Sequence, residues 1–339
     1  GDNTLVLSGT VEGNSSVEIF DGATSLGSVT ANGSGAWSFS TATLVDGSHS
    51  FTAKGTDAAG NTGASSAPLA ITVDTIAPTA ITTLVADIVT DSGTTGDFIT
   101  NDPSVAVSGS FSGTLGLGET IQISADGTNW ITTGTLGPTD SIWVTATDAV
   151  ALVPGAGTLQ TRTIDAAGNI TLGATRAYTL DTSADPLSID LDADTGASLG
   201  DWETSNGMVA VTGLEAGATW QYSTDSGSNW TPGSGSVFTL GEGTYAASSI
   251  VVEQTDVAGN TSSVASATAI VVDSTAPIAP VFGLDSDTGS NPADGVTNDG
   301  DMTVTVMEPG GWKLEYSTNG GGAWTEMIGS TFTLNPGTY

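Results

Sequence analysis

The pattern Asp-x-Ala-Gly-Asn occurs three times in the chain, and this repetition constrains the fold more than any other feature of the sequence. Its copies are residues 57–61, 165–169 and 256–260. Sixteen or seventeen residues after each copy comes an aspartate, Asp74, Asp181 or Asp273, that opens a short linker ending in proline. Successive linker aspartates lie 107 and 92 residues apart, which is the spacing of whole domains on a line rather than of solenoid repeats.

The linkers divide the 339 residues into four repeats, which we call the first (1–74), second (75–181), third (182–273) and fourth (274–339) repeat. Nothing at the start of the first repeat matches the opening strand of the others. The fourth repeat ends about 30 residues before the next expected linker, so both end repeats are expected to be incomplete Ig-sized domains.

Short runs of alternating apolar and polar residues recur between turns, for example at 16–20, 104–107, 208–211 and 302–306. Helical periodicity is nearly absent. Asp-Gly, Ser-Gly and Asn-Gly turns occur at matching places, each followed by a tryptophan (Trp130, Trp230, Trp324), and they indicate β-hairpins. The sequence therefore predicts an all-β fold, a tandem array of antiparallel β-sandwich domains.

Acidic residues dominate the charge: 37 Asp and Glu against four Lys and Arg give a formal net charge of -33. This excludes the attraction to phosphate on which nucleic-acid binding depends, and it argues against anionic membrane surfaces. Such an excess destabilises a compact state unless cations neutralise the carboxylates where they cluster. Because cysteine is absent, thiolate metal sites are excluded and a hard divalent cation is the natural candidate.

Other functional classes find little support. No apolar run approaches the ~18 residues of a membrane span and no signal peptide opens the chain, so we expect no membrane insertion and an internal piece of a longer protein. An enzyme is not expected, because His49 is the only histidine and no glycine loop suits a phosphate. Carboxylate pairs for glycoside hydrolysis could be drawn from the 37 acids, but their repetition at domain ends favours metal sites.

The motifs resemble the bacterial Ig-like tandem domains of giant calcium-binding surface adhesins, the extender regions of biofilm-associated and RTX-type adhesins. The most specific elements are Asp-x-Ala-Gly-Asn, the linker at 73–78, and the Leu-Asp-x-Asp-Thr-Gly loops at 191–196 and 284–289. The second repeat departs from the pattern in its loop at 87–93, and its linker at 181–186 has an extra residue.

This resemblance implies Ig-like sandwiches joined by short linkers into an elongated rod, exported by type I secretion to the bacterial cell surface. Calcium near the domain junctions would stiffen the rod, which would support cell adhesion or biofilm formation. The partners implied are the neighbouring domains of the same chain and, through other regions, a host-surface, glycan or cell-surface ligand. The alternative is a carbohydrate- or protein-binding module in which one repeat contacts the ligand.

Sandwich topology predicts which acidic residues meet. In an Ig-like sandwich the turn before the last strand lies at the N-terminal pole, and the loop after the first strand lies at the other. A last strand from Thr62 to Val73 would separate Asp57 from Asp74 by roughly 35–40 Å. The motif is therefore expected to pair across junctions, in the two groups Asp74, Asp165, Asn169 and Asp181, Asp256, Asn260.

The loop after the first strand adds acids at the opposite pole, where they are expected to face the next junction. Together with Asp273, the further candidate calcium ligands are Asp87, Asp91 and Asp97 in the second repeat and Asp192, Asp194 and Asp201 in the third. Calcium takes six to eight oxygen ligands from carboxylates, carbonyls and water, whereas magnesium keeps its waters more strongly. Calcium is therefore the expected ion.

Simpler interpretations stay open beside this one. Asp57, Asp165 and Asp256 can cap their own turns without a metal. Residues 190–201 superficially resemble an EF-hand loop, but the glycine is seventh and no helix is expected on either side. The three hairpin tryptophans are expected to pack in a core or across strands, with sugar stacking as the alternative.

Overall fold

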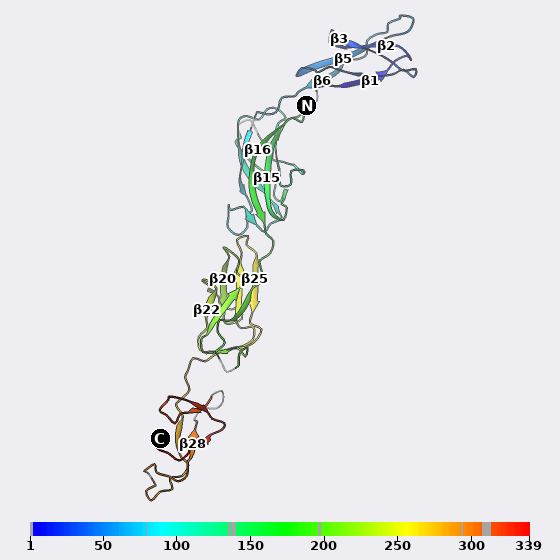
Figure 1. Ribbon diagram of the computed structural model, residues 1–339. Coiled ribbons are helices and arrows are strands. Elements are labelled where there is room, and N and C mark those ends of the chain that lie inside the picture. The colour runs from blue at the N-terminus through cyan, green and yellow to red at the C-terminus, as the bar shows by residue number, and fades with distance from the viewer. Residues whose placement is uncertain are drawn as a thin grey trace. The chain divides into compact units, whose positions relative to one another are not determined.

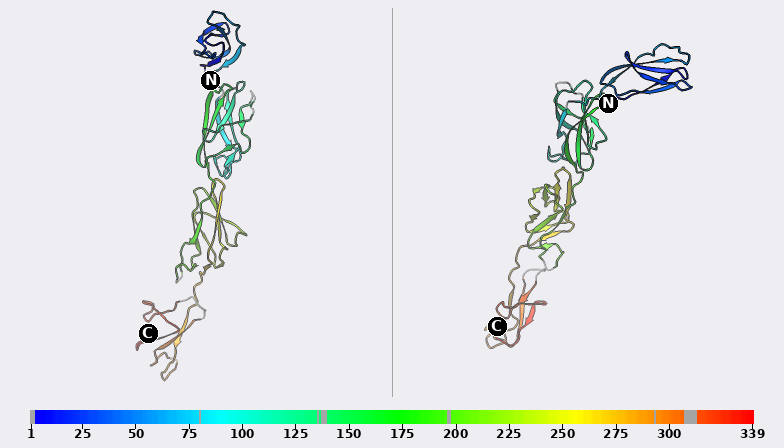
Figure 2. Two further views of the ribbon diagram at one scale, coloured as in Figure 1. Left: turned by 90° about the vertical axis from the view of Figure 1, so that its right-hand side faces the viewer. Right: turned by 45° about the horizontal axis from the view of Figure 1, so that its top comes forward.

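The computed structural model describes residues 3–79, 81–134, 136, 140–195, 198–292, 294–306 and 313–339. Strands are the only regular secondary structure among these residues (Figures 1 and 2), which confirms the all-β prediction. By its packing the chain divides into two units. The first comprises Gly1–Ile189, Val211–Ser236 and Ser249–Ala265, and the second comprises Asp190–Ala210, Val237–Ser248 and Ser266–Tyr339.

The first repeat forms two antiparallel sheets in its described part. One sheet contains β1 and β4, and the other has the order β3-β2-β5-β6. The strands are β1 (Val6–Thr10), β2 (Ser16–Asp21), β3 (Thr24–Thr30), β4 (Ala36–Ser40), β5 (Gly47–Thr56) and β6 (Leu69–Val73). Because side chains alternate between the faces of a strand, Leu7, Val17, Ile19 and Phe51 form a buried core.

The last strand of this repeat is shorter than the sequence suggests. A single strand from Thr62 to Val73 was predicted, but beyond a bridge at Thr62 strand structure resumes only at Leu69. Pro68 lacks the N–H group that a β-ladder needs. Just before it, Ser66 holds Ala53 through two bonds, from its own N–H to the Ala53 carbonyl and from the Ala53 N–H to its hydroxyl.

The second repeat contains the longest strand among the described residues, the 11-residue β16. Its main sheets have the orders β13-β10-β7 and β12-β11-β15-β16-β8, and β14 pairs with β9. The strands are β7 (Ile81–Ile88), β8 (Ile99–Thr100), β9 (Ser104–Val105), β10 (Val107–Ser112), β11 (Thr120–Ser124), β12 (Ile131–Thr132), β13 (Ile142–Val144), β14 (Val150–Ala151), β15 (Gly155–Ile164) and β16 (Ile170–Leu180). Trp143, Ile88 and Leu159 are at the centre of its core.

The third repeat has sheets with the orders β17-β19-β22, β21-β20-β24-β25 and β18-β26-β23. Its strands are β17 (Ser188–Leu191), β18 (Glu203–Thr204), β19 (Met208–Thr212), β20 (Thr219–Ser223), β21 (Thr231–Pro232), β22 (Val237–Thr239), β23 (Gly243–Tyr245), β24 (Val251–Thr255), β25 (Thr261–Ala265) and β26 (Ile270–Val272). The fourth repeat has the sheets β27-β28-β31 and β29-β30, built from β27 (Val281–Leu284), β28 (Asp301–Thr305), β29 (Glu315–Tyr316), β30 (Thr325–Glu326) and β31 (Thr331–Thr333).

The predicted hairpins are present as β11–β12, β20–β21 and β29–β30. In the first of these, Trp130 is half-buried under the guanidinium of Arg162, which lies 4.0 Å from the ring centroid. Trp324 of the last hairpin is 61 % exposed, so a core position is wrong for that residue. Nowhere in the described part of the chain is there a helix with the length and apolarity that crossing a membrane requires.

Candidate metal centre

The Asp-x-Ala-Gly-Asn turn has the same internal hydrogen bonds in all three copies. The aspartate Oδ1 accepts the N–H of the asparagine at 2.7 to 2.8 Å, and Oδ2 accepts its side-chain amide at 2.8 Å. The glycine has a positive φ of 87° to 90°, a conformation that side chains with a Cβ disfavour. The three pairs are Asp57 with Asn61, Asp165 with Asn169, and Asp256 with Asn260. Turn capping is therefore present at every copy, which explains why the pattern recurs.

These bonds also set the charge state of the turn. The hydrogen bond from the Asn61 side chain lowers the pKa of Asp57. For Asp165, burial acts to raise the pKa, but the hydrogen bonds from Asn169 and the turn backbone together outweigh it, so the pKa is lowered. Both aspartates are thus stabilised in the anionic form, which is the form that binds a cation.

In the second and third repeats the same asparagine also holds the preceding linker. The side-chain amide of Asn169 donates to the carbonyl of Asp74 at 3.0 Å, and that of Asn260 donates to the carbonyl of Asp181 at 2.9 Å. Two residues after each asparagine, a hydroxyl group also bonds to the linker. The hydroxyl of Thr171 donates to the carbonyl of Pro78, and that of Ser262 donates to the carbonyl of Asp185, both at 2.7 Å. The two groups expected from the sequence are therefore brought together at the linkers.

Three carboxylates meet beside the third-repeat linker. Oxygens of Asp181, Glu215 and Asp256 all lie within 4.8 Å of one another, and we call this group the acidic trio. Asp181 follows β16, Glu215 lies in the loop between β19 and β20, and Asp256 follows β24. Asp256 is only 6 % exposed and the other two are half-buried, so their mutual repulsion is poorly screened by water.

The loop that carries Glu215 is fixed by a buried glutamine. The N–H of Glu215 donates to Oε1 of Gln254 at 3.1 Å, and Gln254 is fully buried. Its amide in turn donates to the carbonyl of Asp185 at 2.8 Å and to that of Gly213 at 3.2 Å. The N–H of Asp185 donates to Oε1 of Glu215. The linker and the loop are therefore held together by backbone contacts that position the Glu215 carboxylate.

Sequence reasoning missed Glu215 because it lies outside the repeated motifs. The equivalent position in the second repeat, four residues before the start of β11, is Gly116. The nearby Glu119 accepts the N–H of Gly116 at 2.8 Å. Among the described residues, no other three acidic or histidine side chains come this close together. The Asp74 linker therefore has Asp165 and Asn169 beside it but no counterpart of Glu215.

A second acidic feature recurs in the loop after the first strand. Asp91, Asp194 and Asp287 occupy equivalent positions, and in each the Oδ1 atom is buried without a hydrogen-bond partner. The other oxygen accepts the N–H of a nearby glycine, Gly96, Gly200 or Gly295, at 2.9, 2.6 and 3.1 Å. A buried carboxylate oxygen without a partner is costly, and a cation would satisfy it.

Asp91 shows the electrostatic result. Burial, followed by the negative charges of Asp97 and Asp87, raises the pKa of Asp91 above its ordinary value, although backbone N–H groups act against the shift. Oδ1 of Asp87 is also buried and unpartnered. The donor atoms in this loop and in the acidic trio are all oxygens, which suits a hard cation such as calcium rather than zinc.

The Asp91 loop lies against the turn that carries Asp256. The hydroxyl of Ser92 donates to the carbonyl of Ala258 at 2.6 Å. Gly93 has a φ of +65°, and a Cβ on it would lie 2.0 Å from the Val257 carbonyl oxygen, so only glycine fits. Sandwich topology predicted that this loop faces the next junction, but not the contact through Ser92 and Gly93. This contact places the acids of the Asp91 loop and the acidic trio on the two sides of one junction.

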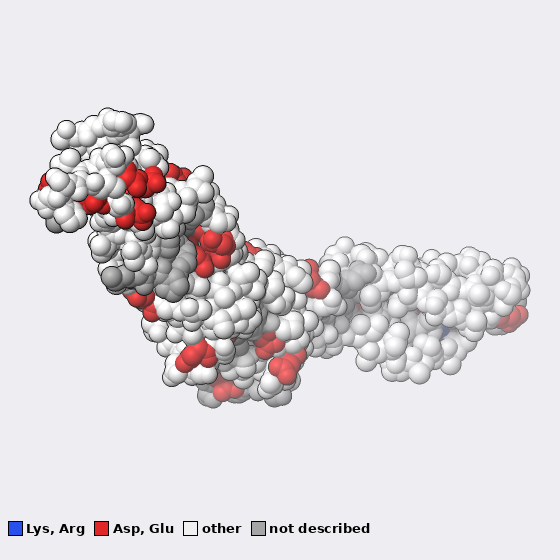
Figure 3. All heavy atoms as spheres, turned by 90° about the horizontal axis from the view of Figure 1, so that it is seen from below, with Lys and Arg blue, Asp and Glu red and all other residues white. Residues whose placement is uncertain are grey.

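The remaining predicted ligands have turn roles in the structure. Oδ1 of Asp97, Asp201 and Asp273 each accepts the N–H two residues further on, at 2.8, 3.1 and 2.9 Å. Asp192 is exposed, and Gly196 of the predicted loop lies outside the described residues. On the face shown in Figure 3 the acidic side chains form separate groups rather than one continuous patch.

Comparison with curated proteins finds no match. Among solved structures, the chain is similar to a tetra-tandem repeat in the extending region of a large adhesion protein, with 20 % identity, 98 % of this chain and 86 % of that chain covered, and a TM-score of 0.27. A 1.5-MDa bacterial ice-binding adhesin matches with 22 % identity, coverage of 80 % and 91 %, and a TM-score of 0.32. Fibronectin(III)-like modules of Clostridium thermocellum CbhA match with 15 % identity, coverage of 53 % and 87 %, and a TM-score of 0.35.

A family model gives the clearest assignment. Residues 1–75 match the family described as the bacterial Ig-like domain. The matched residues include the Asp57 turn, whose hydrogen bonds recur at Asp165 and Asp256. The first repeat is thus similar to the bacterial Ig-like domain family, and the second and third repeats contain the same turn.

Proposed function

We propose that the chain is a structural extender segment of a secreted bacterial surface adhesin, stiffened by calcium bound at the junctions between its Ig-like repeats. The observation that carries the proposal is the acidic trio: a linker, a loop and a turn, far apart in sequence, each direct one carboxylate to the same point. Asp181, Glu215 and Asp256 would hold the ion. Bound calcium would neutralise their repulsion and tie the three segments together.

The other predicted ligands would form further sites. Asp74, Asp165 and Asn169 surround the preceding linker with fewer carboxylates, so we propose a weaker site there. Asp87, Asp91 and Asp97, and in the third repeat Asp192, Asp194 and Asp201, would contribute through loops in which one carboxylate oxygen has no partner. Asp273 would act at the linker to the fourth repeat.

The wider role is supported by the family match of residues 1–75 and by the resemblance in sequence. We propose domains at 1–74, 75–181, 182–273 and 274–339, a non-catalytic role, and a place outside the cell at the bacterial surface after type I secretion. The partners would be neighbouring domains of one long chain, with a glycan, host-surface or cell-surface ligand bound by other regions in adhesion or biofilm formation. In the alternative function, one repeat would itself bind a carbohydrate or protein.

Calorimetric titration of the chelated full chain with Ca²⁺ tests the proposal. Several saturable sites are expected, and Asp181→Ala should remove one while leaving the Asp74 linker unaffected. Glu215→Gln keeps an oxygen for the N–H of Asp185 but removes a charge, so it should weaken one site by about tenfold or more. Glu119→Gln is the matched control, because Glu119 also accepts a backbone N–H but lies outside the acidic trio.

Two outcomes would refute the calcium role: no heat beyond dilution, or equal effects of Glu215→Gln and Glu119→Gln. The extender role is tested separately by small-angle scattering. Linkers of a few residues with a proline restrict bending, so three to four sandwiches of roughly 35–40 Å should give a maximum dimension well over ~100 Å with calcium. A near-spherical profile would contradict it.

A further inference from the structure

The linker between the second and third repeats contains an aspartyl-prolyl peptide bond, between Asp185 and Pro186. Two features of such a bond favour its hydrolysis. The aspartate carboxylate can attack its own main-chain carbonyl carbon and form a cyclic anhydride. The prolyl nitrogen is more basic than other amide nitrogens, so it is protonated more easily and leaves more readily. The surroundings of the bond determine whether the fold protects it or promotes its cleavage.

Two hydrogen-bond donors converge on the carbonyl oxygen of Asp185. The side-chain amide of Gln254 donates to this oxygen at 2.8 Å, and the hydroxyl of Ser262 donates to it at 2.7 Å. Gln254 is fully buried, and its Oε1 accepts the N–H of Glu215, which fixes the amide nitrogen toward the linker. Attack on the carbonyl carbon moves negative charge onto the carbonyl oxygen. Two donors that are already in place stabilise this charge, as in an oxyanion hole.

The groups on either side of the carbonyl also suit the attack. Asp185 is exposed, and among the described residues none donates a hydrogen bond to its carboxylate, so the side chain can rotate onto its own carbonyl carbon. Its N–H donates to Oε1 of Glu215. The carbonyl of Pro186 packs against Gly213, where an added Cβ would lie 2.2 Å from the carbonyl oxygen. The backbone is therefore fixed on both sides of the bond, while the attacking group is not.

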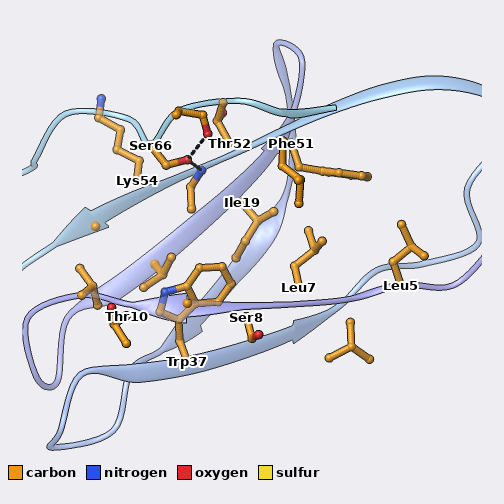
Figure 4. Close-up of a pocket in the computed structure, with 18 of the residues that line it drawn as sticks. Leu5, Leu7, Ser8, Thr10, Ile19, Trp37, Phe51, Thr52, Lys54 and Ser66 are labelled. Carbon is orange, nitrogen blue, oxygen red and sulfur yellow. Dashed lines mark hydrogen bonds between the residues drawn. The ribbon is translucent and has the colours of Figure 1, made fainter. Parts of the chain in front are cut away.

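Two other residues that precede proline show what is particular to Asp185. Asp102 also has a carboxylate, but its Oδ1 accepts the N–H of Ser104 at 3.0 Å, so the carboxylate is engaged. The hydroxyl of Ser66 donates to the carbonyl of Ala67 at 3.0 Å (Figure 4), but alanine has no group that could attack. Of these three bonds, only that of Asp185 combines an unengaged carboxylate with donors to its carbonyl.

We propose that the chain cleaves itself between Asp185 and Pro186. A carboxylate oxygen of Asp185 forms a bond to the carbonyl carbon of the same residue, and Gln254 and Ser262 stabilise the charge on the carbonyl oxygen. The C–N bond then breaks as the nitrogen of Pro186 takes a proton from the solvent. Water opens the cyclic anhydride, which restores the Asp185 side chain and leaves a new C-terminal carboxylate. The net reaction is hydrolysis, and it separates the first two repeats from the third.

Mass spectrometry of the full chain tests the proposal, after incubation in mildly acidic buffer in which circular dichroism shows the strands intact. The chain contains its own control, because the bond between Asp102 and Pro103 has the same chemistry. In urea, where the fold is lost, the two bonds should be cleaved at similar rates. In the folded chain, the bond after Asp185 should be cleaved about tenfold faster or more than the bond after Asp102.

Three variants separate the effect of the fold from the chemistry of the bond itself. Ser262→Ala removes one donor and should slow cleavage in the folded chain by about tenfold or more, with no change in urea. Thr171→Ala is the matched control, because Thr171 donates in the same way to Pro78 of the preceding linker, and it should leave the rate unchanged. Asp185→Ala should abolish cleavage at this bond. Equal cleavage of the two aspartyl-prolyl bonds in the folded chain, or equal rates for Ser262→Ala and Thr171→Ala, would overturn the proposal.

Discussion

At the scale of single residues, the fold disfavours the charged form of Asp91. Its Oδ1 is buried without a partner, and burial is the main cause of its raised pKa. At a pH between 3.8, the ordinary pKa, and the raised pKa of the folded chain, Asp91 has lost its proton in the unfolded chain but keeps it in the folded chain. Stability therefore falls as the pH rises from 3.8 through the folded pKa, unless a cation compensates the charge.

Replacing Asp91 with Asn should consequently raise the melting temperature in chelator near neutral pH. Asparagine keeps an oxygen for the N–H of Gly96 but carries no charge. The same variant should gain less from added Ca²⁺ than the parent chain. Calorimetric melting with and without calcium measures both effects. Asp97→Asn is the control, because Asp97 is exposed in the same loop, and a lower melting temperature for Asp91→Asn in chelator would contradict the argument.

His49 provides a pH-dependent contact in the first repeat. Its Nδ1 lies 2.6 Å from Oδ2 of Asp21 and its Nε2 lies 2.8 Å from the Val45 carbonyl, so both nitrogens face acceptors. The hydrogen bond to Asp21 is the main cause that raises the pKa of His49, and the same bond lowers the pKa of Asp21.

The contribution of His49 is therefore complete below its ordinary pKa of 6.5 and is lost as the pH rises through the raised folded value. The contribution of Asp21 is lost as the pH falls below 3.8 through its lowered folded value. An NMR titration should show the His49 ring titrating above pH 6.5, and Asp21→Asn should move it back toward 6.5. A ring that titrates below 6.5 in the parent chain would show that the pair is not formed.

At the scale of elements, the sequence predicted what local chemistry determines. The hairpins before Trp130 and Trp230 formed because Asp126 and Asp225 accept the N–H groups of their own turns, as Asp-Gly and Ser-Gly patterns suggest. The meeting of the Asp165 and Asp256 turns with the preceding linkers was predicted from sandwich topology. Glu215 could not be predicted for two reasons. Its loop is positioned by a hydrogen bond to a buried glutamine in a strand distant in sequence, and the equivalent residue of the second repeat is glycine.

The sequence predicted that the loop after the first strand faces the next junction, but not which of its residues make the contact. The sequence marks Gly93 as a turn residue, but only the structure shows that the Val257 carbonyl lies where its side chain would be. The last strand of the first repeat was predicted to be continuous, but Pro68 lacks the N–H that a β-ladder needs, and the strand resumes only at Leu69. Turn residues in the sequence therefore predicted the strands and hairpins, whereas the residues of the site that depend on loop packing were seen only in the structure.

Gly93→Ala tests the contact between the second and third repeats. The substitution places a Cβ 2.0 Å from the Val257 carbonyl oxygen, so the loop must move and expose the turn at Ala258. Amide exchange at 257–259 should accelerate. Gly96→Ala is the matched control: Gly96 also has a positive φ, +85°, but nothing lies within 4 Å of its added Cβ. Both variants carry a backbone cost of about 1–2 kcal/mol, and only Gly93→Ala should loosen the turn. Equal exchange in the two variants would show that the contact does not order the turn.

At the scale of the whole molecule, the net charge of -33 predicts a stability that depends on cations. Free calcium at ~100 times the dissociation constant of a site would stabilise the folded state by about 2.7 kcal/mol, enough to raise the melting temperature of a domain of this size by several degrees. Melting curves in chelator and in millimolar calcium, at equal ionic strength, should therefore differ. Magnesium should give a smaller shift, and superimposed curves in calcium and chelator would mean that the acids are only solvated turns.

The difference between Gly116 and Glu215 gives neighbouring junctions different numbers of charges. As calcium rises, the third-repeat junction would fill first and the second-repeat junction only at higher concentration, so the chain would respond gradually over a range of concentrations rather than at one threshold. Gly116→Glu would bring the calcium concentrations at which the two junctions are half-filled closer together. In a chain of such unequal junctions, the number of junctions stiffened by bound calcium would reflect the calcium concentration of the surroundings.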